Sequence, residues 1–270
     1  MHIARQVHRS VTRANQSIHL AAHRLPETSD FTVSALPEPA NEPAIGPATA
    51  IQSLNVLKPG RPIIQADTCF QFDQNGLADG AQHPNTIFTH NYARDGGGIF
   101  NFGDVLAYFK SITVHDNEAL TGGGMSMRFG SSIRVDDSRI TDNFAEFRGG
   151  GAVINYGSNA EFNNVTFSAN RTNGNGGGVW VDNQASQYGG TRPVFTRSRF
   201  ENNQAGFIGG GIHNFNVTTT VIDRTTFINN KADVGSNIAN TLNSRVSMQE
   251  NTVDPETVYT DDSSSVDLSR

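Results

Sequence analysis

Large apolar residues recur at a fixed distance before an asparagine, and three small residues, usually glycines, follow each asparagine a few positions later. Six copies of this pattern occupy residues 88–99, 114–125, 140–152, 167–179, 200–212 and 227–238. Their asparagines are 26, 26, 27, 33 and 27 residues apart, at Asn91, Asn117, Asn143, Asn170, Asn203 and Asn230. A repeat of nearly constant length in this range is typical of solenoids, in which each repeat forms one coil.

Three columns of apolar residues can be read from the repeat. The first column is the residue three positions before each asparagine. The second column lies five residues before the first. The third column follows the small residues, at Ile99, Met125, Ala152, Val179, Ile212 and Ile238. Apolar positions alternate with polar ones, as strands require, and the glycines would interrupt any helix in every coil. The pattern predicts an all-β fold, a single right-handed parallel β-helix with three short strands per coil of about 26–27 residues.

The polar positions of the repeat have physical roles in such a fold. Asparagines at one turn position would stack about 4.8 Å apart, and their amides can bond along the axis. The glycines allow the tight bend into the next side. Because the step from Asn170 to Asn203 is about six residues longer than the others, we expect a loop to leave the stack within residues 182–193.

The rest of the chain differs in composition. Residues 1–60 are basic at first and then rich in Pro, Glu and Ala, which predicts a disordered or leader segment. Residues 61–253 are assigned to the β-helix, with 61–84 as its N-terminal cap, because terminal repeats are usually atypical. Residues 254–270 are acidic and serine-rich, and we expect a flexible tail.

Charge and hydropathy narrow the classes of function. The net charge of −6 gives no basic patch for nucleic acid. No apolar run approaches the ~20 residues of a membrane span, and the N-terminus has no apolar core typical of a secretory signal. The one cysteine, Cys69, cannot form an internal disulfide. The oligomeric state stays open.

The repeat resembles that of the polymorphic outer membrane proteins, within the pectin-lyase-like superfamily of right-handed parallel β-helices. The F-x-x-N part is carried by Phe88/Asn91, Phe167/Asn170, Phe200/Asn203 and Phe227/Asn230, and glycine triplets end at 98, 124, 151, 178 and 211. The resemblance covers about residues 85–240. It implies a non-catalytic module at the cell surface, associated with the outer membrane, or secreted. Such a module would adhere to a glycan or to a host or neighbouring surface protein.

Carboxylates offer an alternative interpretation, since β-helices of similar shape include polysaccharide lyases and hydrolases. Asp116 and Asp142 each precede a ladder asparagine and would be neighbours on adjacent coils, where they could share a proton or bind Ca²⁺. In the alternative interpretation, Asp116 and Asp142 are turn residues whose side chains point into solvent. With Arg128 and Asp182 they form the candidate catalytic set. No cofactor is expected otherwise, because no phosphate loop, zinc spacing or dinucleotide fingerprint occurs.

The strand after the glycines predicts an aromatic outer face. If Ile99 and its equivalents point inward, the residues that point outward include Phe100, Phe102, Trp180, His213 and Phe215. Grouped exposed aromatics usually mark an interaction site, with the insertion around 184–192 as one wall. The competing interpretation is that a loop or a terminal segment packs over them.

Substitution of Trp180 separates these two interpretations. If the face is exposed, Trp180→Ala should leave thermal stability nearly unchanged and weaken ligand binding by ~1–3 kcal/mol. If Trp180 is buried, the same change should cost ~3–5 kcal/mol of stability. Thermal denaturation combined with a binding assay distinguishes the outcomes, and a large loss of stability without a binding defect would contradict the first interpretation.

Overall fold

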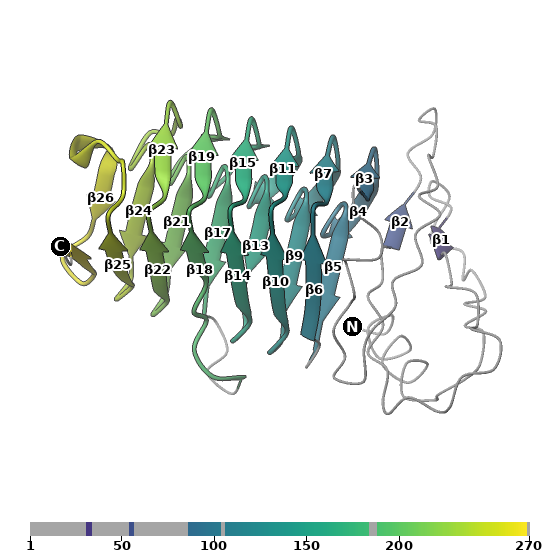
Figure 1. Cartoon of the computed structure of the whole chain (residues 1–270), viewed down its shortest axis with the longest axis horizontal. Coiled ribbons are helices and arrows are strands. Elements are labelled where there is room, and N and C mark those ends of the chain that lie inside the picture. The colour runs from purple at the N-terminus through teal and green to yellow at the C-terminus, as the bar shows by residue number, and fades with distance from the viewer. Residues whose placement is uncertain (1–30, 34–53, 57–85, 104–105, 184–187, 269–270) are drawn as a thin grey trace.

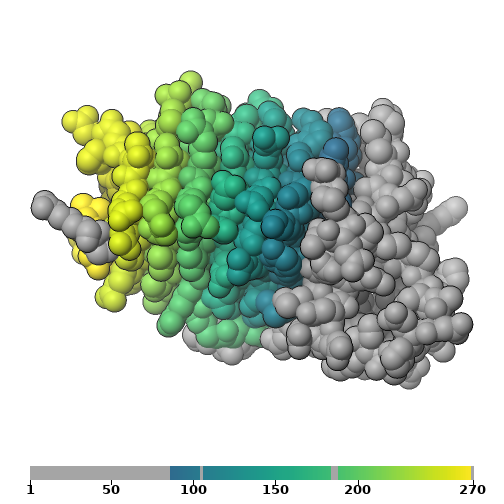
Figure 2. Space-filling view, viewed as in Figure 1, coloured from purple at the N-terminus to yellow at the C-terminus, as the bar shows by residue number. Residues whose placement is uncertain are grey.

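The computed structural model describes residues 31–33, 54–56, 86–103, 106–183 and 188–268. From residue 86 onward the strands form an elongated parallel solenoid whose coils follow one another along the long axis (Figure 1). In the space-filling view these coils appear as adjacent bands of successive colour (Figure 2). The predicted all-β parallel β-helix is therefore confirmed, with about six turns in the described part.

Each coil passes through four sheets, which we number in the order that the chain visits them. Sheet 1 comprises β3 (Ile87–Thr89), β7 (Thr113–His115), β11 (Arg139–Thr141), β15 (Thr166–Ser168), β19 (Arg199–Glu201) and β23 (Thr226–Ile228). Sheet 2 comprises β4 (Tyr92–Asp95), β8 (Glu118–Thr121), β12 (Phe144–Arg148), β16 (Arg171–Thr172) and β20 (Gln204–Ala205).

The other two sheets have seven strands each and continue to the C-terminal end. Sheet 3 comprises β5 (Ile99–Phe102), β9 (Met125–Arg128), β13 (Ala152–Ile154), β17 (Val179–Asp182), β21 (Ile212–Phe215), β24 (Ile238–Thr241) and β26 (Val258–Thr260). Sheet 4 comprises β6 (Leu106–Lys110), β10 (Ser132–Asp136), β14 (Asn159–Asn163), β18 (Val194–Thr196), β22 (Thr219–Asp223), β25 (Arg245–Gln249) and β27 (Ser265–Leu268).

The sequence pattern identified three sides per coil, whereas the structure has four. The strands of sheet 2 are short, and their inward positions are held by small residues such as Ala93, Ala119, Ala145 and Ala205. Alanine gives little hydropathy contrast with its neighbours, so this side does not stand out in the sequence. The three predicted apolar columns are the inward faces of sheets 1, 3 and 4.

Phenylalanines fill the centre of the solenoid in aligned stacks. The rings of Phe167 and Phe200 lie 4.7 Å apart and nearly parallel, and Phe227 follows Phe200 at 4.9 Å. A second stack joins Phe162 to Phe195 at 5.2 Å. These separations equal the strand spacing, because equivalent positions of successive coils carry the same side chain. Burial of this continuous core is what the repeats gain from stacking.

The predicted asparagine column is a hydrogen-bonded ladder at the corner between sheets 1 and 2. The Oδ1 atom of Asn143 accepts bonds from the backbone N–H and from Nδ2 of Asn117, both at 3.0 Å. Its own Nδ2 donates to the carbonyl of Val114 at 2.9 Å and to Oδ1 of Asn170 at 3.0 Å. The same pattern repeats from Asn91 to Asn230. Each buried amide is thereby satisfied by the next coil.

The glycine triplets form the corner between sheets 2 and 3. The first glycine of the triplet Gly149–Gly151 has a φ of 63°, a conformation that glycine adopts without strain. A Cβ atom on Gly150 would come within 2.5 Å of the carbonyl oxygens of Arg171 and Gly177 in the next coil. Only glycine therefore allows the coils to pack closely at this corner.

The ends of the chain differ from the sequence expectations. Residues 254–268 are not a flexible tail, because β26 pairs with β24 and β27 pairs with β25, continuing the parallel stack after a short 3₁₀ turn at Pro255–Thr257. Within residues 1–60, β1 (Phe31–Val33) and β2 (Leu54–Val56) pair in antiparallel fashion. The rest of the expected leader and the expected cap at 61–84 lie outside the described residues.

Removing one amide from the middle of the ladder should destabilise the solenoid strongly. Asn143→Ala leaves two donors of Asn117 and the carbonyl of Val114 without their partner, and each unsatisfied buried group costs roughly 1–3 kcal/mol. We expect a loss of about 3–5 kcal/mol in the free energy of unfolding, measured by chemical denaturation. Asn91→Ala, at the half-buried end of the ladder, is the control and should cost less than half as much. Equal losses would contradict the role of the ladder.

Candidate functional site

The outer face of sheet 3 carries the residues that the sequence predicted to form an aromatic surface. The register aligns Val153, Trp180 and His213 on neighbouring strands, and Phe102 is next to Arg128. Their outward placement is as expected, but their exposure is not. Trp180 is 3% exposed and His213 is 2% exposed, whereas Phe102 is 39% exposed. The expectation of one continuous exposed aromatic face is therefore wrong.

Neighbouring side chains cover Trp180. The guanidinium carbon of Arg148, at the end of a sheet 2 strand, lies 4.5 Å from the centroid of the indole ring. The ring of Phe215 stacks at 6.2 Å and contacts His213 at 5.7 Å. Sheets 2 and 3 meet at the glycine corner, so a long side chain from sheet 2 can reach over sheet 3. The described end of the insertion contacts other aromatics instead, since Tyr188 lies 5.7 Å from Phe129.

Buried polar atoms without partners accompany Trp180. Within the described part of the chain they include Asn155 Oδ1, Asp182 Oδ2 and His213 Nδ1, on or beside consecutive strands of sheet 3. Burial raises the pKa of Asp182 to about 6, partly opposed by a hydrogen bond from Asn216. Burial also lowers the pKa of His213 to about 4, and the charge of Arg148 acts in the same direction. Asp182 and His213 are thus held where their charged forms are disfavoured.

The candidate catalytic residues occupy two separate parts of the solenoid. Asp116 and Asp142 lie at the corner between sheets 1 and 2 with φ angles of 53° and 56°, where both are exposed. Arg128 and Asp182 lie on the outer face of sheet 3, with β13 between their strands. The structure therefore does not bring the four residues together. They cannot act on one bond.

Two of these residues already have structural partners. Arg128 forms a 2.6 Å ion pair with Asp95 and donates to Thr121 at 2.6 Å, and burial lowers its pKa against the opposing effect of Asp95. His115 contacts the carboxylate of Asp116 at 2.7 Å. Among the described residues no group of three or more His, Cys, Asp or Glu side chains could hold a metal ion. Binding of Ca²⁺ at Asp116 and Asp142 stays a prediction.

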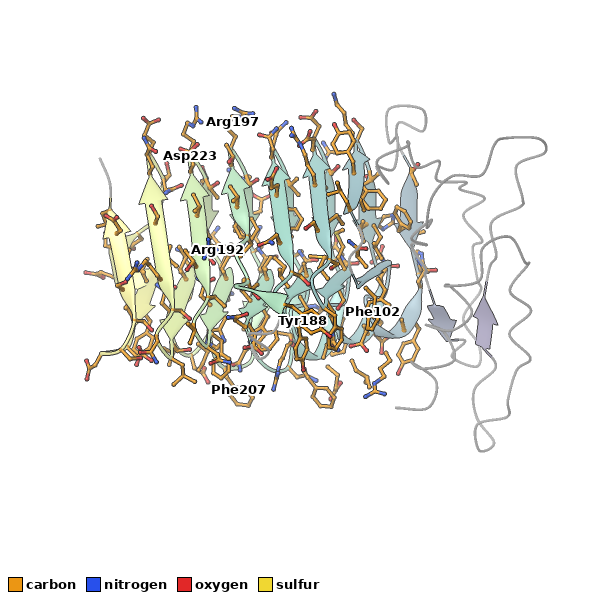
Figure 3. All side chains as sticks on the ribbon, turned by 90° about the horizontal axis from the view of Figure 1, so that it is seen from below. Phe102, Tyr188, Arg192, Arg197, Phe207 and Asp223 are labelled. Atoms are coloured by element: carbon orange, nitrogen blue, oxygen red, sulfur yellow. The ribbon has the colours of Figure 1, made fainter. Side chains whose placement is uncertain are left out.

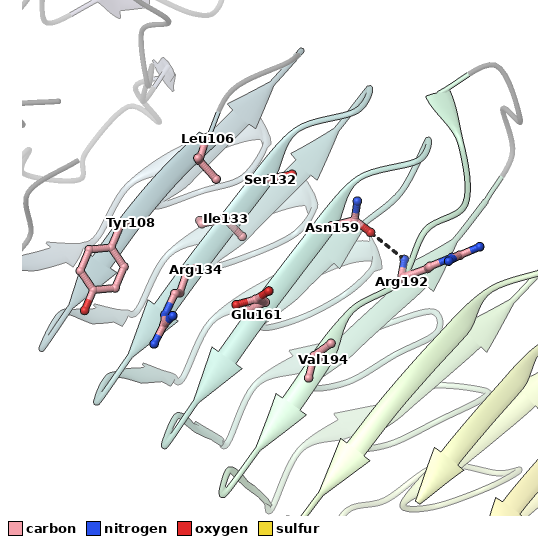
Figure 4. Close-up of a pocket in the computed structure, with 9 residues that line it drawn as sticks. All are labelled: Leu106, Tyr108, Ser132, Ile133, Arg134, Asn159, Glu161, Arg192 and Val194. Carbon is pink, nitrogen blue, oxygen red and sulfur yellow. Dashed lines mark hydrogen bonds between the residues drawn. The ribbon is translucent and has the colours of Figure 1, made fainter. Parts of the chain in front are cut away.

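The structure adds a groove that the sequence did not predict. It has a volume of about 800 Å³ and runs over the outer faces of β6, β10, β14 and β18 (Figure 4). Its lining comprises Leu106, Tyr108, Ser132, Ile133, Arg134, Asn159, Glu161, Arg192 and Val194. The parallel register places Tyr108, Arg134, Glu161 and Val194 side by side. One ring, two charges and one apolar side chain thus form a row across four coils.

Arg134 is held firmly in this row. Its Nε donates to both carboxylate oxygens of Asp136 at 3.2 Å, and its guanidinium lies 5.7 Å from the centre of the Tyr108 ring. The hydroxyl of Tyr108 donates to Asp136 at 3.0 Å, and burial with this bond raises the pKa of Tyr108. Among the described residues no ion pair engages Glu161 or Arg192. These two side chains are the charged groups available to a ligand.

An aromatic row lies at the turns between sheets 3 and 4. Phe129 stacks on Tyr156 at 4.5 Å, with Phe102 at 4.9 Å from Phe129. Tyr188 completes the row, with its ring 5.7 Å from that of Phe129 (Figure 3). Ser132 and Asn159 of the groove follow Phe129 and Tyr156 by three residues, so the row lies at the turns that lead into β10 and β14. The aromatic face predicted from the sequence included Phe102, but it did not include Phe129 and Tyr156, because they lie in the turns after the strands.

The fold defines the class of the protein, a right-handed parallel β-helix. A family model described as "right handed beta helix region" matches residues 60–189. No curated protein matches the chain, and no solved structure does either. With the solenoid, the family match supports the pectin-lyase-like β-helix superfamily, whereas the polymorphic outer membrane protein repeat is not confirmed. In the described residues no helix has the length and hydropathy to cross a membrane.

The buried carboxyl of Asp182 should make stability depend on pH. A folded-state pKa of about 6 lies above the ordinary value of 3.8, so its contribution to stability is complete below pH 4 and is lost as the pH rises through 6. Asp182→Asn should therefore raise the free energy of unfolding at pH 7.5 by about 1–3 kcal/mol and change it little at pH 4. Denaturation at both pH values measures this.

The exposed Asp142→Asn is the matched control and should alter neither value. His213 has the opposite sign, because a lowered pKa gives stability that is present above pH 6.5 and lost as the pH falls through 4. His213→Gln should therefore reduce the loss of stability in acid. A gain for Asp182→Asn that is the same at both pH values would contradict the burial of an ionised carboxylate.

Proposed function

We propose that this chain is a non-catalytic β-helical module that binds a glycan through the groove on sheet 4. The observation that supports the proposal is the composition of the groove, which combines the Tyr108 ring, the amide of Asn159 and the charged groups of Glu161 and Arg192. Sugars present apolar C–H faces together with many hydroxyl groups, so a site for them needs both rings and polar side chains. The groove offers these in two neighbouring rows, one with Tyr108 and Glu161 and the other with Asn159 and Arg192.

The shape of the groove favours an extended ligand. It crosses four strands of one sheet, which corresponds to about 14 Å at a strand spacing of about 4.8 Å. Parallel pairing fixes these strands, and the ion pair with Asp136 fixes Arg134. A ligand would therefore bind to side chains that are already in position, which lowers the entropy lost on binding.

The charges favour a neutral or weakly charged glycan. Arg134 is neutralised by Asp136, and Glu161 and Arg192 carry opposite charges. A strongly acidic polysaccharide would need an excess of basic side chains in the groove. A protein partner at the same surface is an alternative, although the open groove is lined mainly by small or polar side chains apart from Leu106, Ile133 and Val194.

Catalysis is the competing proposal, in which the chain would be a polysaccharide lyase or hydrolase. General acid–base chemistry needs two groups that converge on one bond. The carboxylates considered from the sequence are separated, and in the groove Asp136 is bound to Arg134 and Tyr108. The binding proposal therefore has the stronger support. A location outside the cell, at the surface or secreted, accompanies it.

Removal of one groove cation tests the proposal. Titration with a panel of soluble neutral and acidic polysaccharides, followed by calorimetry, should show binding to a neutral glycan. Arg192→Ala should weaken this binding by about tenfold, the scale of one charge-assisted contact. Arg245→Ala is the matched control, because Arg245 occupies the equivalent position two coils beyond Arg192 but lies outside the groove.

Two results would contradict the proposal. If Arg192→Ala and Arg245→Ala weakened glycan binding equally, the glycan would bind outside the groove or through non-specific electrostatic attraction. New reducing or unsaturated ends in the same incubations would show turnover and favour the enzyme.

A further inference from the structure

An extra residue precedes the glycine triplet in three consecutive coils, and it forms an exposed column on the side of sheet 2. These residues are Phe147, Gly174 and Phe207. Backbone hydrogen bonds align them, since the N–H of Asn175 donates to the carbonyl of Phe147 at 3.3 Å and the N–H of Phe207 donates to that of Gly174 at 3.1 Å. The pairing of β12 with β8 is irregular at this point, as expected for an inserted residue.

The two phenylalanines are the most exposed of the described residues of that type. Phe147 is 55% exposed and Phe207 is 60% exposed. Figure 3 shows Phe207 at the edge of the molecule, away from the groove residue Arg192. The backbone beneath Phe207 is fixed, because the N–H of Ile208 donates to Oδ1 of Asn175 at 3.2 Å. A large apolar side chain held in water on a rigid backbone suggests an interaction surface.

Gly174 keeps the space between the two rings open. A Cβ atom at this position would collide with the carbonyl oxygen of Phe147. Any residue with a side chain at position 174 would therefore force the backbone to shift. The gap is therefore fixed by coil packing.

The width of the gap matches one aromatic ring. In the core, where three consecutive coils carry phenylalanine, the rings of Phe167, Phe200 and Phe227 stack at 4.7 and 4.9 Å. Phe147 and Phe207 are two coils apart, so their separation is about 9.6 Å for strands about 4.8 Å apart. One inserted ring would lie at the usual stacking distance from both.

We propose that this column is an interface between two copies of the chain packed antiparallel, with a phenylalanine of each copy inserted into the gap of the other. If the partner's Phe207 faces Gly174, the two-fold symmetry places Phe207 opposite the partner's Gly174. The four rings then form a continuous row in the order Phe147, the partner's Phe207, Phe207 and the partner's Phe147.

The self-complementary spacing favours a second copy as the occupant. A two-fold interface requires that one surface supply both the inserted group and its receptor, and this column supplies a ring and a gap one coil apart. Nearby exposed charges are mixed, with Glu146, Arg148 and Lys231, so two identical surfaces do not repel each other through one sign of charge. The small number of anchors predicts a weak dimer with an interface below ~1,200 Å².

Sedimentation equilibrium of the full chain over a range of concentrations tests the interface. We expect reversible dimerisation that Phe207→Ser weakens by at least about tenfold, since two anchors are lost per dimer. Val217→Ser is the matched control, because Val217 is 56% exposed on another side of the solenoid and its loss should leave the dissociation constant unchanged. Far-ultraviolet circular dichroism checks that both variants fold.

A chain that is monomeric up to about 1 mM, or a dimer weakened equally by Val217→Ser, would overturn the proposal. The proposal would also be overturned if the chain were monomeric and its Phe207→Ser variant lost binding to a soluble glycan, because the gap would then bind a sugar.

Discussion

The asparagine ladder is the constraint on which the rest of this structure depends. Each ladder amide is buried at a corner, and its hydrogen bonds are completed only by the asparagines of the coils above and below. A coil displaced by one residue would leave several buried donors and acceptors without partners, at a cost that exceeds the net stability from one coil. The ladder therefore fixes the register. Once the register is fixed, every other position of the coil is aligned with its equivalents along the axis.

Alignment of equivalent positions explains both the core and the surfaces. Inside, it stacks phenylalanine on phenylalanine at the strand spacing. Outside, the same spacing sets Tyr108, Arg134 and Glu161 side by side in the groove of sheet 4. At the sheet 2 corner it leaves a gap of one ring between Phe147 and Phe207. Ligand contacts on such a scaffold are thus separated by multiples of one distance, which suits linear ligands and symmetric pairing.

Sheet 3 shows how a local corner changes the environment of a surface. The glycine triplets bring the ends of sheet 2 close to the outer face of sheet 3, so Arg148 can cover Trp180. Asp182 and His213 are buried with it, and each retains an atom without a hydrogen-bond partner among the described residues. Their pKa shifts have opposite effects on stability between about pH 4 and 6.5, so the two groups partly compensate in mild acid. Around Trp180 this face is buried structure with titratable groups, whereas Phe102 on the same sheet is 39% exposed.

The sequence by itself determined the fold, the coil length, the asparagine ladder and three of the four sides, because these features repeat and depend on contacts between equivalent residues. It also determined which residues of sheet 3 point outward, since strands alternate. Only the tertiary structure decided that Trp180 and His213 are buried, that Asp116 and Asp142 are remote from Arg128 and Asp182, and that residues 254–268 join the stack. Residues 254–268 pair with equivalent positions, but they lack the asparagine and the glycine triplet by which the repeat is recognised. The first two outcomes depend on contacts between non-equivalent positions, such as Arg148 over Trp180, and on the angle between adjoining sheets. A repeat pattern carries no record of such contacts, because they occur once and between sides of the coil that the sequence does not align.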